Sequence, residues 1–157
     1  MGKSFKSIGD LESFLKNAIQ DCMEYEVAEE VKSAMAMWAE PNVYAKYAPK
    51  RYERTYALSN KYFYDAESVG DMKIAVTPHI PFNPIGAIAG ESTGMGEEEL
   101  IHYGDGGGGH RYLWETGDRP YKAPRPWIPD AFEDLNGSGS AAAALAMGLQ
   151  NKGISVK

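Results

Sequence analysis

The chain contains 157 residues, of which 43% are hydrophobic and 24% are charged, so it is suited to form one globular domain, residues 1–157, around a hydrophobic core. Its formal net charge is -6, which argues against a protein whose whole surface binds nucleic acid. No run approaches the roughly 18 apolar residues of a membrane span and no signal peptide is recognisable, so we expect a protein made in the cytoplasm without membrane contact.

A long amphipathic helix is predicted over residues 8–40. Apolar side chains recur there at every third or fourth position, with charged residues between them. Ser7 or Asp10 can cap its start by accepting a hydrogen bond from a free backbone N–H, and Pro41 is expected to end it because proline lacks that N–H. Cys22, the single cysteine, falls at an apolar position of the helix, which predicts a buried, inert thiol and no disulfide bond.

The length of this helix leaves two interpretations open. At 1.5 Å per residue it is about 45 Å long, which exceeds what the rest of a small domain can cover. It either packs as a core helix on a sheet or extends one end to a neighbouring subunit. In the second case Met35, Met37 and Trp38 near its end are suitable contact residues, since these side chains adapt well to protein partners.

Aromatic and basic side chains alternate after this helix. The segment can contact another protein, with Tyr52 and Arg54 as candidates, because tyrosine and arginine dominate protein interfaces. It can also bind nucleic acid, since aromatic rings stack on bases and cations neutralise phosphates. The residues concerned are Tyr44, Lys46, Tyr47, Lys50, Arg51, Tyr52, Arg54 and Tyr56. A nucleic-acid-binding accessory protein would use Lys46, Lys50, Arg51 and Arg54.

An antiparallel β-hairpin is predicted over residues 56–80. Two runs rich in aromatic and β-branched residues, 61–68 and 71–80, are separated by residues of turn composition. Pro78 and Pro81 are expected to end the second strand, because each removes a backbone donor from the ladder. The hairpin is the main part of the predicted sheet.

Residues 82–110 lose all periodicity and are rich in glycine, which predicts a long mobile loop that becomes ordered when it docks on a neighbouring protein. The loop also contains an alternative chemical site. His102, Asp105 and His110 are residue types that bind zinc and similar ions, as a metal-dependent hydrolase would require. No H-E-x-x-H helix, cysteine pair or serine-nucleophile motif accompanies them, so we predict no catalytic residue, no cofactor and no metal.

A strand and the start of a C-terminal helix are predicted over residues 111–135, and a final helix over 138–153. Ser138 or Ser140 can cap the final helix, and Gly153 is expected to end it. The apolar side of the preceding helix is formed by Ala131, Phe132 and Leu135. The predicted fold class is therefore α+β, with a long N-terminal helix and a C-terminal helix packed on a small antiparallel sheet.

A proline-rich segment leads into the C-terminal helix and contains Arg119, Arg125 and Trp127. Its restricted backbone lowers the entropic cost of holding these side chains in place. The segment is either a rigid lead-in with Trp127 in the core or a contact surface for another protein.

Two segments carry a resemblance to a known family. Residues 112–135, YLWETGDRPYKAPRPWIPDAFEDL, resemble the signature of the small head–tail joining or tail-completion (minor neck) proteins of long-tailed bacteriophages. In that family an aromatic strand, a proline-bounded loop and a basic-proline-aromatic triplet precede the final helix. The matching residues here are Tyr112, Trp114, Glu115, Thr116, Gly117, Arg125, Pro126 and Trp127. Residues 47–62, YAPKRYERTYALSNKY, are similar to the family's segment before the hairpin through Ala48, Pro49, Thr55, Leu58 and Ser59.

The resemblance implies a nonenzymatic virion protein that is made in the host cytoplasm and assembles as a homo-oligomeric ring, a hexamer or dodecamer, at the neck. Its neighbours would be the capsid connector and the tail terminator or tail tube, and DNA would pass through the ring without specific binding. The interface residues that we expect are Trp38, Tyr52, Arg54, Arg119, Arg125 and Trp127.

Overall fold

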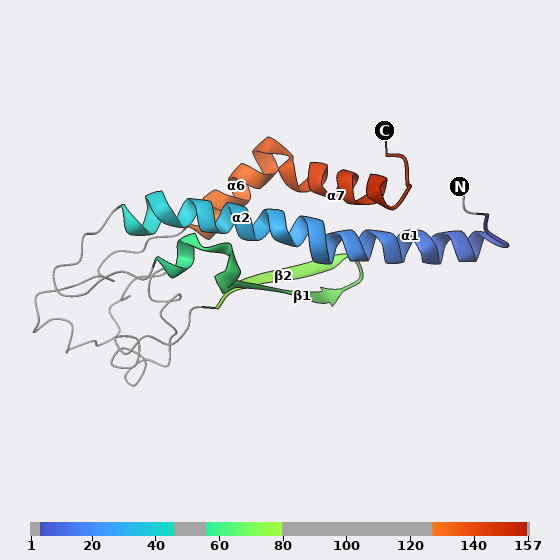
Figure 1. Ribbon diagram of the computed structural model, residues 1–157, viewed down its shortest axis with the longest axis horizontal. Coiled ribbons are helices and arrows are strands. Elements are labelled where there is room, and N and C mark those ends of the chain that lie inside the picture. Colours follow the sequence, from blue (N-terminus) through green and yellow to red (C-terminus); the bar gives the residue numbers. More distant parts are fainter. Residues whose placement is uncertain (1–3, 46–55, 80–126, 157) are drawn as a thin grey trace, which may run out of the picture.

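The computed structural model describes residues 4–45, 56–79 and 127–156. These residues form three layers, with a long helix in the middle, a β-hairpin on one side and two C-terminal helices on the other (Figure 1). The architecture is α+β, as predicted. The predicted glycine-rich loop and the strand expected after it lie outside the described residues.

The middle layer is one continuous helical run from Ile8 to Tyr44. It consists of α1 (Ile8–Cys22), the π-helical turn η1 (Met23–Val27), α2 (Ala28–Ala39) and a second π-helical turn, η2 (Glu40–Tyr44). The start is capped as one of the two expected alternatives: the Ser7 hydroxyl accepts a hydrogen bond from the backbone N–H of Asp10 at 3.1 Å. This bond satisfies one of the free donors of the first turn.

The prediction that Pro41 ends the helix is wrong. In an α-helix a proline ring clashes with the carbonyl four residues earlier and leaves that carbonyl unbonded. Here the chain widens into η2, in which hydrogen bonds span five residues, as between the Ala45 N–H and the Glu40 carbonyl at 2.9 Å. The wider turn accommodates the proline, so the helix continues to Tyr44.

The hairpin layer begins with two short 3-10 turns, η3 (Ala57–Ser59) and η4 (Lys61–Phe63). The antiparallel strands β1 (Tyr64–Gly70) and β2 (Lys73–Pro78) follow. The turn lies at Asp71 and Met72, slightly later than the predicted position, and Met72 adopts a left-handed conformation with φ of 55°.

The tip of the hairpin is attached to the long helix by Gln20. Its side-chain oxygen accepts a hydrogen bond from the Met72 backbone N–H at 2.6 Å, and its amide nitrogen donates to the Ser68 hydroxyl at 2.8 Å. One side chain of α1 therefore binds both sides of the turn, which fixes the direction of the hairpin along the helix.

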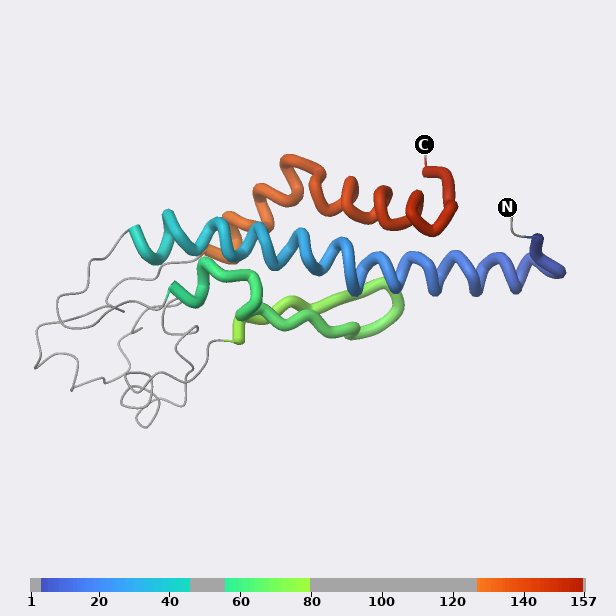
Figure 2. The backbone as a smooth tube through the Cα atoms, in the orientation of Figure 1, coloured from blue at the N-terminus to red at the C-terminus, as the bar shows by residue number. Residues whose placement is uncertain are grey.

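The third layer contains α6 (Ile128–Ser138) and α7 (Ser140–Asn151). Gly139 separates them in a left-handed conformation with φ of 68°, which glycine adopts without a steric cost. Gly153, with φ of 80°, follows the end of α7, and the Ile154 N–H donates to the Leu149 carbonyl at 2.9 Å. The first described residues of the N-terminus and the end of α7 lie at the same end of the molecule (Figure 2).

The core lies where these layers meet. Its largest cluster joins the long helix, the start of the hairpin and α6, and contains Val27, Val31, Ala34, Met35, Ala36, Ala39, Val43, Leu58, Tyr64, Trp127, Ala131 and Leu135. A smaller cluster of Ala18, Cys22 and Leu149 joins α1 to α7. Phe132 was expected on the apolar side of its helix, but it is 49% exposed, because Ala131 and Leu135 already fill the contact with α2.

Gly148 allows α7 to approach the long helix closely. A Cβ atom at this position would lie 2.8 Å from the sulfur of Cys22, which is fully buried and has little room to move. We predict that Gly148→Ala lowers the free energy of unfolding by about 1–3 kcal/mol, the usual cost of overpacking. Urea denaturation followed by circular dichroism measures this change.

The matched control is Gly137→Ala on α6, where an added Cβ meets no atom within 4 Å. Alanine forms helix better than glycine, so this variant should be as stable as the wild type or more stable by about 0.5–1 kcal/mol. Equal effects of the two substitutions would contradict the close contact at Gly148.

Candidate assembly surfaces

Trp127 belongs to the hydrophobic core of the protein. Its side chain is 1% exposed and its indole N–H donates a hydrogen bond to the hydroxyl of Tyr64 at 3.2 Å. Of the two roles that the sequence left open for Trp127, the structure shows the one in the core, while residues 119–126 of the same segment lie outside the described part of the chain. The inclusion of Trp127 among the interface residues is therefore corrected, because a fully buried ring has no surface to offer a partner.

Further hydrogen bonds connect this indole to the turn before the hairpin through tyrosine hydroxyl groups. Tyr64 donates to the carbonyl of Leu58 at 2.8 Å, and the hydroxyl of Tyr44 accepts from the Leu58 backbone N–H at 2.9 Å. Tyr44 also packs on the ring of Tyr56, with 4.8 Å between the ring centroids. Tyr44 and Tyr56, which belong to the aromatic and basic segment predicted to contact a partner, thus support the turn that precedes the hairpin.

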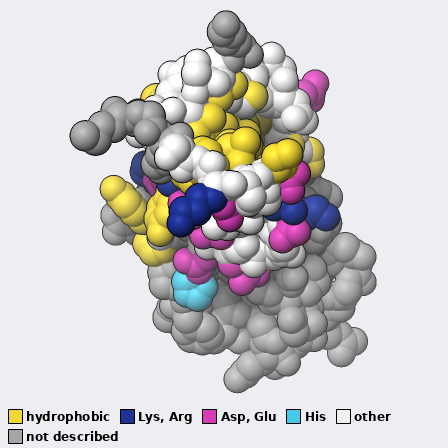
Figure 3. Space-filling model, turned by 90° about the vertical axis from the view of Figure 1, so that its right-hand side faces the viewer, with side chains coloured by type: hydrophobic (Ala, Val, Ile, Leu, Met, Phe, Trp, Pro, Cys, Tyr) yellow, Lys and Arg dark blue, Asp and Glu magenta, His cyan; other side chains and the backbone are white. Residues whose placement is uncertain are grey.

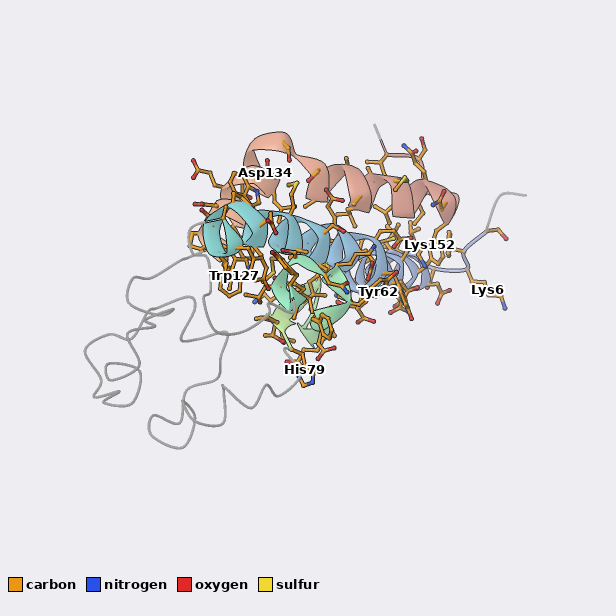
Figure 4. All side chains as sticks on the ribbon, turned by 60° about the vertical axis from the view of Figure 1, so that its left-hand side comes forward. Lys6, Tyr62, His79, Trp127, Asp134 and Lys152 are labelled. Atoms are coloured by element: carbon orange, nitrogen blue, oxygen red, sulfur yellow. The ribbon has the colours of Figure 1, made fainter. Side chains whose placement is uncertain are left out.

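Trp38 packs on α6 of the same chain. Its indole N–H donates to the carboxylate of Asp134 at 3.3 Å, and nearby Asn42 donates to Asp130 at 2.6 Å. Figure 4 shows Asp134 and Trp127 on opposite sides of the long helix. Trp38 is half-buried, and it holds α6 against α2; Met37 beside it is exposed.

The other predicted site residues lie outside the described part of the chain. They are the interface candidates Tyr52, Arg54, Arg119 and Arg125, the metal candidates His102, Asp105 and His110, and the nucleic-acid candidates Lys46, Lys50 and Arg51. The mobile loop expected over residues 82–110 also lies there.

Cys22 is fully buried as expected, and this burial raises the pKa of its thiol, which disfavours the reactive thiolate. Within residues 4–45, 56–79 and 127–156, no three His, Cys, Asp or Glu side chains come together in a group that could hold a metal ion. In the same ranges no helix has both the length and the apolar character needed to cross a bilayer.

The N-terminal end of α1 extends beyond both neighbouring layers. Ile8 is 78% exposed, Leu11 is also exposed, and the first buried residue of the helix is Ala18. The sequence predicted a helix too long for its domain to cover, with the contact residues near its C-terminal end. At that end the structure instead buries Met35 in the core. The uncovered end could have been located only by knowing where α7 stops.

Exposed large apolar side chains also occur on both outer layers. On the hairpin side, Tyr62 is 84% exposed and the turn exposes Val69 and Met72; on the helical side, α6 exposes Phe132 and α7 exposes Met147. The figure with side chains shows Tyr62 beside the hairpin, away from the C-terminal helices (Figure 4). The molecule therefore exposes large apolar side chains on opposite sides of its long helix.

Comparison with known proteins identifies the family through a match that spans residues 7–151. The chain belongs to the YomN family. This family is phage-derived and prophage-like, so the protein is phage-related, as the resemblance of residues 112–135 implied at its coarsest level. Neither the comparison with curated proteins nor that with solved structures gives a match.

The hydroxyl of Tyr64 should contribute measurably to stability. Tyr64→Phe removes the acceptor of the Trp127 indole N–H and the donor to Leu58, and leaves two buried polar groups without that partner. We expect the free energy of unfolding to fall by about 1–3 kcal/mol, measured by urea denaturation. Tyr62→Phe is the control, because its exposed hydroxyl is solvated in both states; a comparable loss there would contradict the assignment.

Burial raises the pKa of Tyr64 well above its ordinary value. The folded state therefore keeps this phenol neutral, while the unfolded chain releases its proton above a pKa of about 10. The associated stability is complete below about pH 10 and is lost as pH rises further, by about 1.4 kcal/mol per pH unit until the folded-state pKa is reached.

Urea midpoints at about pH 8 and pH 11 test this dependence. The wild type should lose more stability between the two values than Tyr64→Phe, which has no proton to release at this position. An identical loss in both proteins would show that Tyr64 does not carry the alkaline sensitivity.

Proposed function

We propose that this protein is a structural, nonenzymatic component of the virion of a tailed phage. In this proposal its subunits form a homo-oligomeric ring at the neck that joins the head to the tail or completes the tail. The neighbours of the ring are the connector and the tail terminator or tail tube, and DNA passes through without specific binding. The protein is made in the host cytoplasm and ends in the virion.

The observation that carries the proposal is the exposure of large apolar side chains on opposite sides of the long helix. A ring closes through heterologous contacts, in which one face of each subunit meets a different face of the next. Tyr62 on the hairpin side and Phe132 on the helical side are suitably placed for such a contact. Burial of each side chain between subunits would contribute roughly 1.5–3 kcal/mol.

The stiffness of the subunit also supports this function. The helical run from Ile8 to Tyr44 crosses the described molecule, and both outer layers attach to it through buried apolar contacts and hydrogen bonds from Gln20 and Trp38. A subunit built on one straight element keeps its outer faces at fixed relative positions, which a closed ring requires. The phage-derived family of the chain agrees with a role in the particle.

Deletion of the gene from the phage or inducible prophage that encodes it tests the function. We expect particle formation to stop before heads and tails join, so that electron microscopy of the lysate shows separate heads and tails. Expression of the wild-type protein from a plasmid should restore joined particles. Normal particles in the deletion strain would contradict the proposal.

Complementation with single variants tests which faces are used. Tyr62→Glu and Phe132→Glu place a charge on an exposed apolar position and should leave the subunit folded but reduce joined particles at least about 10-fold. The matched control is Glu133→Gln, a neighbouring exposed position of α6 that should complement normally. Full complementation by both charged variants would show that these faces do not form the ring.

A further inference from the structure

The uncovered end of α1 continues a helix face that the subunit itself already uses for packing. Ala18 and Cys22 on this face are buried against Leu149 of α7. Their spacing of four residues, preceded by Leu15, Leu11 and Ile8 at intervals of three and four, places all five side chains on one side of the helix. α7 covers the second part of this face and leaves the first part open.

The open face lies at the end of the molecule where α1 extends past α7 and past the hairpin turn (Figure 1). A view onto this end shows hydrophobic side chains gathered above a belt of charged ones (Figure 3). The open segment runs from Ile8 to the residue before Ala18, a length of about 15 Å at 1.5 Å per residue. An apolar helix face of this length needs one further helix to cover it.

The outer face of α7 has a matching character. The helix has no charged residue from Ser140 to Asn151, although a surface helix usually carries charges on its solvent side. Its exposed positions include Ala142, Ala143 and Met147, of which Met147 is 56% exposed. Small alanine side chains allow another helix to approach closely, and methionine adapts its shape to the side chains that it meets.

The open face of α1 and the outer face of α7 match each other in length, side-chain size and charge. The helix α7 is about 18 Å long, close to the length of the open end of α1. Large side chains project from α1, whereas the outer face of α7 is mostly small. Residues 4–17 contain two lysines, Lys6 and Lys16, and two acids, Asp10 and Glu12, and therefore have no net charge. In a chain with a net charge of -6, both faces avoid the repulsion between like charges.

We propose that two copies of this chain pair about a two-fold axis, so that the open end of α1 in each copy packs on the outer face of α7 in the other. The symmetry follows from the direction of the two faces. Both point toward the side of the long helix on which α7 lies, so two copies must be turned by 180° to bring them together. Such a rotation satisfies both contacts at once, which is the property of an isologous pair.

This pairing is separate from the ring contact proposed above, which needs faces on opposite sides of the subunit. The dimer is the form of the free protein before assembly, and it shields Ile8 and Leu11 from water until other particle components are present. The dimer is therefore tested with the purified protein alone. The joining of heads and tails tests the ring independently.

Sedimentation equilibrium of the purified full chain over micromolar concentrations is the first test. We expect a monomer–dimer equilibrium, and Leu11→Glu or Ala143→Arg should raise the dissociation constant by roughly 10- to 100-fold, because each places a charge in the apolar contact. Both residues are exposed in the subunit, so circular dichroism should show an unchanged fold. Met37→Glu, at an exposed apolar position of α2 outside both faces, is the matched control and should dimerise as the wild type does.

Disulfide crosslinking identifies the partner face. A mixture of Leu11→Cys and Met147→Cys should give a crosslinked dimer under mild oxidation, while each variant alone should not, and Cys22 is too buried to react. A monomer at all concentrations up to about 100 μM, or a dimer insensitive to both charged variants, would overturn the proposal. Crosslinking of Leu11→Cys with itself would also overturn it, because that result would mean that α1 pairs with α1.

Discussion

The described fold depends on the burial of Trp127 between segments that are far apart in the sequence. Its indole belongs to the main hydrophobic cluster, which also contains Met35, and donates to the hydroxyl of Tyr64, which in turn donates to the carbonyl of Leu58. The start of α6, the turn before the hairpin and the middle helix therefore meet around one side chain. A tryptophan contributes a large apolar area and one donor that needs a partner, so this position fixes both the packing and the orientation of the two outer layers.

The long helix supplies the surface on which the layers assemble. The π-helical turn η2 keeps the run continuous at Pro41, where an ordinary α-helix would be interrupted, and the other π-helical turn, η1, contacts both α7 and the hairpin strands. Because the outer layers attach along only part of this helix, its first turns remain open. The exposure of Ile8 and Leu11 is thus a direct consequence of unequal lengths, because the N-terminal end of α1 extends beyond both neighbouring layers.

The exposed apolar side chains relate the fold to the proposed function of the protein. A subunit with apolar side chains on opposite sides can close a ring, and one with complementary faces on the same side can form a two-fold pair. Tyr62 and Phe132 are exposed residues proposed for the first kind of surface, and Ile8 and Met147 are exposed residues proposed for the second. Membership of the YomN family makes the protein phage-related, and the proposed assembly contacts agree with that origin.

The sequence alone determined the local structure, because periodicity, capping and turn chemistry act over a few residues. It located the long helix, the buried Cys22 and the α+β class, and it limited the cap of the helix to Ser7 or Asp10, of which the structure uses Ser7. Only the tertiary structure decided which faces of the helix are covered. Leu11 and Met35 both belong to the same periodic apolar pattern, yet Leu11 is exposed and Met35 is buried. Burial depends on which distant element reaches each position, and the close approach of α7 to the long helix at Gly148 is a tertiary contact that no local pattern records.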